Sequence, residues 1–117
     1  EGDLVRRAAL EVLARRLPDL RTRALLLRLS AKGNPMTARQ TAVRLLEGFL
    51  AADAPDGPAV RGVRVALASP FDPLRRTACE VAGRNAGIFA ADIRRLLRHE
   101  PDPRSRRVLE EGLAGQP

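Results

Sequence analysis

The side chains that carry most covalent and metal chemistry are scarce in this sequence. Among 117 residues there is one cysteine, Cys79, and one histidine, His99. A cysteine nucleophile needs a base beside it, and His99 is the single candidate. A metal site needs more ligands than the pair His99-Glu100 can supply. We therefore interpret Cys79 as a small core residue, and we expect a non-enzymatic protein with no cofactor and no metal.

Charge is the more informative property of the composition. Lysine and arginine number 21 and aspartate and glutamate 14, which gives a formal net charge of +7, and Lys32 is the one lysine. Guanidinium groups bind carboxylates and phosphates through paired hydrogen bonds. The chain has neither tryptophan nor tyrosine to stack on a nucleic-acid base. The composition favours a binding surface for acidic groups over an active site.

The periodicity of apolar residues predicts helices nearly throughout, separated by short turns rich in proline, glycine and aspartate. Asp3, Asp72 and Asp102 stand at predicted helix starts, where a carboxylate can accept hydrogen bonds from free backbone amides. In the second helix we expect Leu20 and Ala24 to face inward. The predicted helices cover residues 3–17, 19–30, 34–52, 58–68, 72–83, 88–99 and 102–114.

The starts of four of these helices repeat one another. An arginine recurs at positions 6, 39, 75 and 106, with spacings of 33, 36 and 31 residues. An aspartate precedes it in three units, and a small residue, such as Ala78, follows three positions later. Periods of this length built from helix pairs are typical of stacked helical repeats. The predicted units are residues 3–33, 34–71, 72–101 and 102–115.

The pattern Asp-Pro-x-Arg-Arg-x-Ala, ending in glycine, resembles HEAT and HEAT-like (PBS-lyase-type) repeats, and residues 72–83 match it best. Armadillo and tetratricopeptide arrays are the alternatives, the latter disfavoured because their Trp and Tyr positions have no counterpart. The resemblance implies an all-α, right-handed α-α superhelix, a solenoid of about three hairpins plus one terminal helix. It also implies an internal ladder of Asp–Arg pairs, made of Asp3, Arg6, Arg39, Asp72, Arg75, Asp102 and Arg106.

The second helix of each pair carries a further set of arginines. If Leu20, Val60 and Ile93 are equivalent inward positions, the residue after each one is an arginine. The resemblance implies that second helices line a concave surface, where these arginines would form a basic stripe. An ordinary solvated face of long charged side chains is the alternative interpretation. The candidate binding residues are Arg21, Arg28, Arg61, Arg64, Arg94, Arg95 and Arg98.

The sequence thus predicts one domain over residues 1–117, either a whole protein or part of a longer one. Its expected function is a scaffold that binds another protein with an acidic surface. The alternative function is binding of the nucleic-acid backbone without sequence preference. No apolar run approaches the roughly 18 residues of a membrane span. We expect no membrane partner and a cytoplasmic location, and the end helices leave homo-oligomers open.

Overall fold

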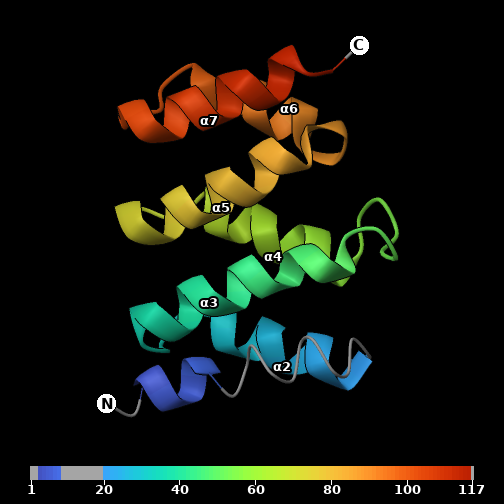
Figure 1. Cartoon of the computed structure of the whole chain (residues 1–117), viewed down its shortest axis with the longest axis vertical. Coiled ribbons are helices and arrows are strands. Elements are labelled where there is room, and N and C mark those ends of the chain that lie inside the picture. The colour runs from blue at the N-terminus through green and yellow to red at the C-terminus, as the bar shows by residue number, and fades with distance from the viewer. Residues whose placement is uncertain (1–2, 9–19, 117) are drawn as a thin grey trace.

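The computed structural model describes residues 3–8 and 20–116, and all regular secondary structure in these two ranges is helical (Figure 1). This confirms the all-α prediction. Residues 3–8 are helical, and a 3₁₀ turn, η1, covers Glu47–Phe49. The α-helices are α2 (Leu20–Ser30), α3 (Met36–Leu46), α4 (Pro58–Leu67), α5 (Asp72–Arg84), α6 (Ala86–Leu97) and α7 (Pro103–Ala114).

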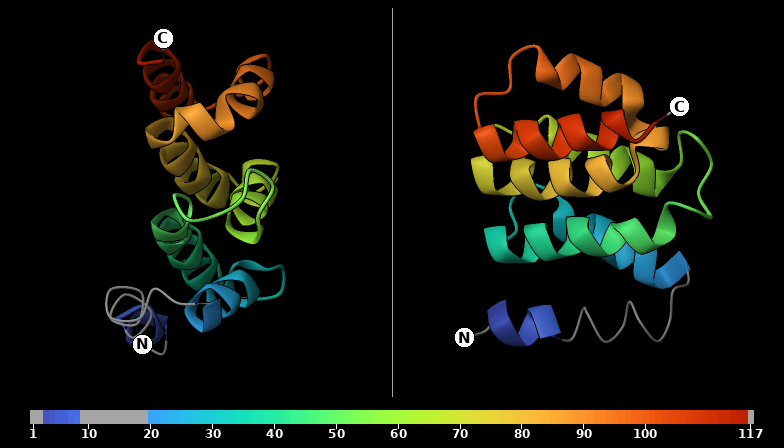
Figure 2. Two further views of the ribbon diagram at one scale, coloured as in Figure 1. Left: turned by 90° about the vertical axis from the view of Figure 1, so that its right-hand side faces the viewer. Right: turned by 45° about the horizontal axis from the view of Figure 1, so that its top comes forward.

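The helices form two layers, and successive helices along the chain alternate between them. Figure 2 shows α3, α5 and α7 side by side in one layer, with α2, α4 and α6 behind them. In the first layer α5 packs directly on both α3 and α7. In the second layer α2 touches α4, whereas α4 and α6 barely meet. The molecule measures 36 × 29 × 19 Å.

Local sequence signals set several helix ends. Proline occupies the first turn of α4, α5 and α7, where its missing N–H costs nothing. Asp102 is the N-cap of α7, since its carboxylate accepts from the Ser105 backbone N–H at 3.3 Å and from its hydroxyl at 2.8 Å. Gly33 has φ = 102°, a left-handed conformation that suits glycine, in the turn after α2.

Two predicted boundaries differ from the structure. The third helix ends at Leu46 and tightens into η1, instead of continuing to residue 52. The fifth helix ends within the predicted stretch 83–87, but the break is shorter than predicted: α5 reaches Arg84 and α6 starts at Ala86 rather than at Ile88. Asn85 lies in this turn, where its side-chain amide donates to the Val81 carbonyl and to the Glu47 carboxylate, both at 2.8 Å, and a kink follows at Phe89, with φ = −107° and ψ = 16°.

The inward face of α2 was predicted wrongly. Leu20 is 69% exposed and Ala24 is exposed, whereas Thr22 and Leu26 are buried. The run from Leu25 to Leu29 supplies more leucines than one stripe needs, so periodicity alone permits two registers. In the first predicted helix, Val5 is likewise exposed, and the continuation of its stripe at Ala9, Val12 and Leu13 lies outside the described residues.

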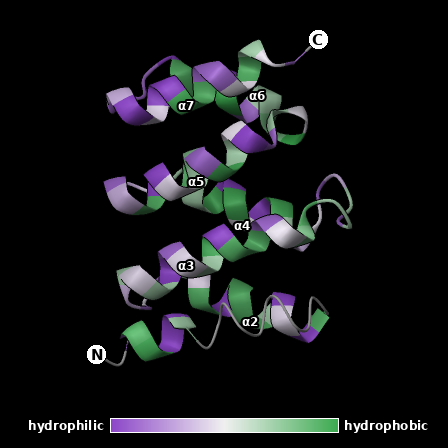
Figure 3. Ribbon diagram, in the orientation of Figure 1, coloured by the Kyte–Doolittle hydropathy of each residue, from purple (hydrophilic) through white to green (hydrophobic). Residues whose placement is uncertain are grey.

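The core is built from helices of both layers, and Figure 3 shows hydrophobic residues recurring along each of them. Helix α5 is central and contacts α3, α4, α6 and α7. Two glycines allow it to lie close to α7: a Cβ added at Gly112 would meet the Gly83 carbonyl oxygen at 2.5 Å. The largest fully buried side chains include Leu26, Leu46, Leu74, Phe89, Ile93 and Leu109.

Candidate functional site

The recurrent arginines bind the carbonyl ends of preceding helices. Arg39 Nε donates to the Ser30 carbonyl at 3.0 Å, and Arg106 Nη1 donates to the Leu97 carbonyl at 2.7 Å. Ser30 and Leu97 are the last residues of α2 and α6. Free carbonyls at helix C-termini favour cationic donors. The repeat of arginines therefore has a structural role at each turn between units.

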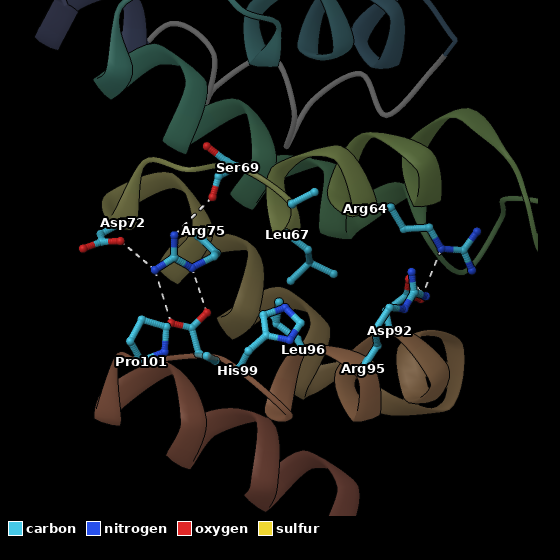
Figure 4. Close-up of a pocket in the computed structure, with 12 residues that line it drawn as sticks. Arg64, Leu67, Ser69, Asp72, Arg75, Asp92, Arg95, Leu96, His99 and Pro101 are labelled. Atoms are coloured by element: carbon cyan, nitrogen blue, oxygen red, sulfur yellow. Dashed lines mark hydrogen bonds and ion pairs between the residues drawn. The ribbon is translucent and has the colours of Figure 1, made fainter.

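Arg75 has the same role and adds a buried ion pair. Its Nη1 donates to the Ser69 carbonyl at 3.1 Å, and its Nε donates to Glu100 Oε1 at 2.7 Å (Figure 4). Asp72 binds Arg75 Nη2 at 2.6 Å. The Glu100 side chain is 1% exposed and that of Arg75 is 12% exposed. Hydrogen bonding to Glu100 is the largest cause that raises the pKa of Arg75 above its usual range.

Among the described residues, one aspartate and one arginine of the expected ladder bind each other, Asp72 and Arg75. Asp102 instead binds Arg76 Nε at 3.1 Å, and a hydrogen bond from Ser105 is the main cause that lowers the pKa of Asp102. Arg39 and Arg106 bind backbone carbonyls. Arg6 is exposed and Asp3 half-buried on the helical segment 3–8. The recurrent arginines therefore bind mainly backbone carbonyls. The spacing of residues in the sequence could not distinguish such hydrogen bonds from ion pairs with carboxylates.

Further ion pairs join successive units. Glu47, at the start of η1, binds Arg84 of α5 at 2.9 Å. Burial raises the pKa of Glu47, but hydrogen bonds from Arg84 and Asn85 outweigh it, and the net pKa is lowered. Arg23 of α2 binds Asp53 at 3.4 Å, and Asp53 accepts from the Val60 backbone N–H at the start of α4. The carboxylates of this region are therefore mostly neutralised by arginines.

The predicted basic stripe divides into two groups. Arg64 and Arg95 both bind Asp92, at 3.2 and 3.3 Å, and Arg64 also binds Asp56 at 2.7 Å. The other five arginines are exposed and make no ion pair with any residue that the structure describes. We call these five the free arginines: Arg21, Arg28, Arg61, Arg94 and Arg98.

The layer that carries the free arginines is almost without acidic residues. Helices α2 and α4 contain no aspartate or glutamate, and α6 contains only Asp92, which its two arginines neutralise. The other layer has both signs at its surface, with Glu80, Glu111, Arg104 and Arg107 all exposed. Positive charge is therefore concentrated on the side of α2, α4 and α6.

Two of the three predicted inward positions on the second helices are buried. Val60 and Ile93 are both buried, at 1% and 0% exposure, and each precedes an exposed arginine, Arg61 or Arg94. Leu20 is exposed and is not an inward position at all. In this layer α4 and α6 are spread apart, whereas in the other layer α5 packs directly on α3 and α7.

A cleft separates α4 from α6. Its volume is about 520 Å³, and it runs between Arg64 and His99 over the start of α5 (Figure 4). A second hollow of about 580 Å³ continues it past Arg64 toward Pro55 and Ile88. Sequence reasoning missed this cleft, and the single signal for it was Asp92 on an otherwise apolar face of α6. We call this feature the α4–α6 cleft.

Cys79 lies at the centre of the protein, as predicted, with 0% exposure. Burial is the largest cause that raises the pKa of its thiol to about 11. His99 is exposed at the rim of the cleft. Within the described residues no group of three or more His, Cys, Asp and Glu side chains is arranged to hold a metal ion.

The buried thiol leads to a labelling prediction. We expect Cys79 to react with a disulfide reagent at pH 8 at least about 100-fold more slowly in the folded protein than in urea. The thiolate is the reactive form, and both its raised pKa and its burial reduce access to it. Absorbance of the released thiol measures the rate. Equal rates with and without urea would contradict the burial.

Comparison of the chain with protein-family models, with curated proteins and with solved structures gave no match. None of the described helices combines the length and apolar character needed to cross a lipid bilayer. The charge distribution and the α4–α6 cleft are therefore the features of this chain that bear on function.

Proposed function

We propose that this chain is a non-enzymatic, HEAT-like helical scaffold, with its hairpins in a right-handed superhelix, and that it binds an acidic protein partner. The binding surface is the outer side of α2, α4 and α6. The free arginines on it make no ion pair with any described residue, so a partner's carboxylates gain charge-assisted hydrogen bonds to them without breaking existing ones. The concentration of free arginines on a layer with a single, neutralised carboxylate is the observation that supports this function.

The charges elsewhere in the molecule strengthen this proposal. Between residues 20 and 102, seven of the eight aspartates and glutamates bind an arginine. The five free arginines, which make no ion pair with any described residue, are therefore part of the net charge of +7. Leu20 and Val65, which are 69% and 68% exposed, lie in the same layer and add apolar contact area. Mixed arginine and apolar surface is typical of protein interfaces.

Charge reversal tests the surface. A fluorescein-labelled peptide of about 15 residues, rich in glutamate and leucine, is titrated with the protein and followed by anisotropy. We expect the double variant Arg21→Glu/Arg61→Glu to bind at least about tenfold more weakly, because two attractive charge pairs become repulsive. The matched control is Arg104→Glu/Arg107→Glu, which changes net charge equally on the other layer and should weaken binding less than about twofold.

The same assay separates the two candidate partners. Equal loss in both double variants would mean that only net charge matters, and this would overturn the proposed surface. Failure of the peptide to bind the wild type, with tight binding of a 15-base-pair DNA duplex that weakens steeply with salt, would replace the protein partner with nucleic-acid backbone. Circular dichroism confirms that each variant keeps its helices.

A further inference from the structure

We infer that Asp56 is an internal competitor of the acidic partner: its carboxylate occupies Arg64 in the unbound protein, and a carboxylate of the partner displaces it. Once Asp56 is displaced, Arg64 joins the five free arginines as part of the binding surface. This inference rests on the proposed function and specifies how that surface is regulated.

The two carboxylates that bind Arg64 occupy different parts of its guanidinium group. Asp92 accepts from Nε at 3.2 Å (Figure 4), and Asp56 accepts from Nη1 at 2.7 Å. An arginine binds a carboxylate most strongly through two parallel N–H groups. While Asp92 holds Nε, the edge formed by Nη1 and Nη2 is the one that can bind a further carboxylate in this way. Asp56 already takes the Nη1 half of that edge, and its hydrogen bond is the largest cause that raises the pKa of Arg64.

Asp56 is the easier of the two carboxylates to displace. Its side chain is 84% exposed, whereas the side chain of Asp92 is 14% exposed and also binds Arg95. An exposed ion pair contributes little net stability, because water solvates its charges when it breaks. A buried carboxylate that loses its partner is destabilising. A carboxylate of the partner should therefore exchange with Asp56 and leave Asp92 in place.

The loop before α4 holds Asp56 in position through hydrogen bonds of its own. The Gly57 N–H donates to the Ala54 carbonyl at 2.8 Å and closes a turn over residues 54–57. Proline in the second position and glycine in the fourth are typical of a type I β-turn. The Asp53 side chain is 3% exposed and accepts a backbone hydrogen bond from α4 at 3.1 Å, which anchors the loop. The backbone of the loop can therefore stay in place while the Asp56 side chain rotates away.

Arg64 lies beside the proposed binding surface. Arg61, an exposed free arginine, is three residues earlier on α4, and such residues are neighbours on a helix. Val65, the residue after Arg64, is 68% exposed. The Arg64 side chain is itself 34% exposed and lines both hollows of the α4–α6 cleft. A partner that binds Arg61 can therefore reach Arg64 as well.

Removal of the competitor should strengthen binding. The fluorescein-labelled peptide rich in glutamate and leucine is titrated at low ionic strength, where exposed ion pairs are little screened. We expect Asp56→Asn to bind it about threefold more tightly than the wild type does, because the ion pair with Arg64 no longer has to break.

Glu80→Gln is the matched control, since it changes the net charge by the same amount. Glu80 is exposed on α5, in the other layer, and makes no ion pair with any described residue. This variant should bind the peptide within about 1.5-fold of the wild type, because a distant charge is screened.

A double variant tests whether the gain depends on Arg64. In an Arg64→Gln background, Asp56→Asn should leave the affinity unchanged, since the contact that it removes is already absent. The glutamine keeps a side-chain donor for Asp92. Circular dichroism confirms that each variant keeps its helices.

The outcomes distinguish this inference from the proposed function. If Asp56→Asn binds no more tightly than Glu80→Gln, or if the gain persists in the Arg64→Gln background, Asp56 does not compete for Arg64. In that case, sensitivity to Arg21→Glu/Arg61→Glu would leave the proposed surface intact. If the peptide binds neither the wild type nor Asp56→Asn, both the inference and the proposed function are overturned.

Discussion

Replacement of Arg75 by alanine is expected to lower the free energy of unfolding by about 3–5 kcal/mol, because it leaves the buried Glu100 carboxylate without its cationic partner. The Glu100 side chain is 1% exposed and binds Arg75 at 2.7 Å. The substitution also removes the hydrogen bond to the Ser69 carbonyl between α4 and α5. A domain of this size is stable by about 5–15 kcal/mol in total, so the effect is large. Urea unfolding followed by circular dichroism measures it.

A double variant tests whether the unpaired Glu100 carboxylate causes this loss of stability. If the unpaired carboxylate is responsible, Arg75→Ala/Glu100→Ala should be more stable than Arg75→Ala alone, since the second change removes the buried charge. The exposed pair of Arg84 and Glu47 provides the control, with side chains 53% and 28% exposed. Arg84→Ala should cost no more than about 1 kcal/mol. Equal losses for Arg75→Ala and Arg84→Ala would contradict the argument from burial.

Gly112→Ala should also destabilise the protein, by about 2 kcal/mol, with a fall in Tm on the order of 10 °C. In an ordinary exposed helix, this substitution stabilises by up to about 1 kcal/mol, so the expected sign is reversed. The new Cβ would lie 2.5 Å from the carbonyl oxygen and 2.9 Å from the Cα of Gly83, and both are backbone atoms that cannot rotate away. Helices α5 and α7 must therefore separate.

Gly48→Ala is the control for Gly112→Ala. A Cβ at Gly48 would have no neighbour within 4 Å, and its φ is not positive. This variant should match or exceed the wild type, because alanine loses less backbone freedom on folding. Differential scanning calorimetry compares the three proteins. An increase in Tm for Gly112→Ala would show that α5 and α7 do not cross at these glycines.

Local signals in the sequence were enough to predict the helices. They were not enough where a residue's role depends on a contact with a helix far away in the sequence. Asp102 with Pro103 marked the start of α7 correctly, because capping acts within one turn. The stretch 83–87 was correctly predicted to end the fifth helix, but Gly83 itself lies within α5 and its small size serves the contact with α7. A glycine in a helical pattern can mark either the end of the helix or a close contact with another helix. Which of the two applies depends on the helix packed against it.

The candidate site was predicted in part. Arg21, Arg61 and Arg94 were correctly grouped on second helices and are all exposed. The alignment of Arg21 with the other two was wrong, because the leucine-rich α2 permits more than one inward face and Leu20 is on the outer one. The role of Asp92 could not be predicted, since its partner Arg64 lies 28 residues earlier in the chain.

The sequence by itself determined the helical composition, the positions of most turns, the repeat of arginines and the excess of positive charge. These depend on residue type, on proline and cap positions and on spacing within one or two turns. Only the tertiary structure decided which arginines are used internally and which remain free. An arginine side chain reaches several ångströms in many directions, so its partner is chosen by the residues that packing brings near it, as Glu100 is brought to Arg75 across 25 residues of chain.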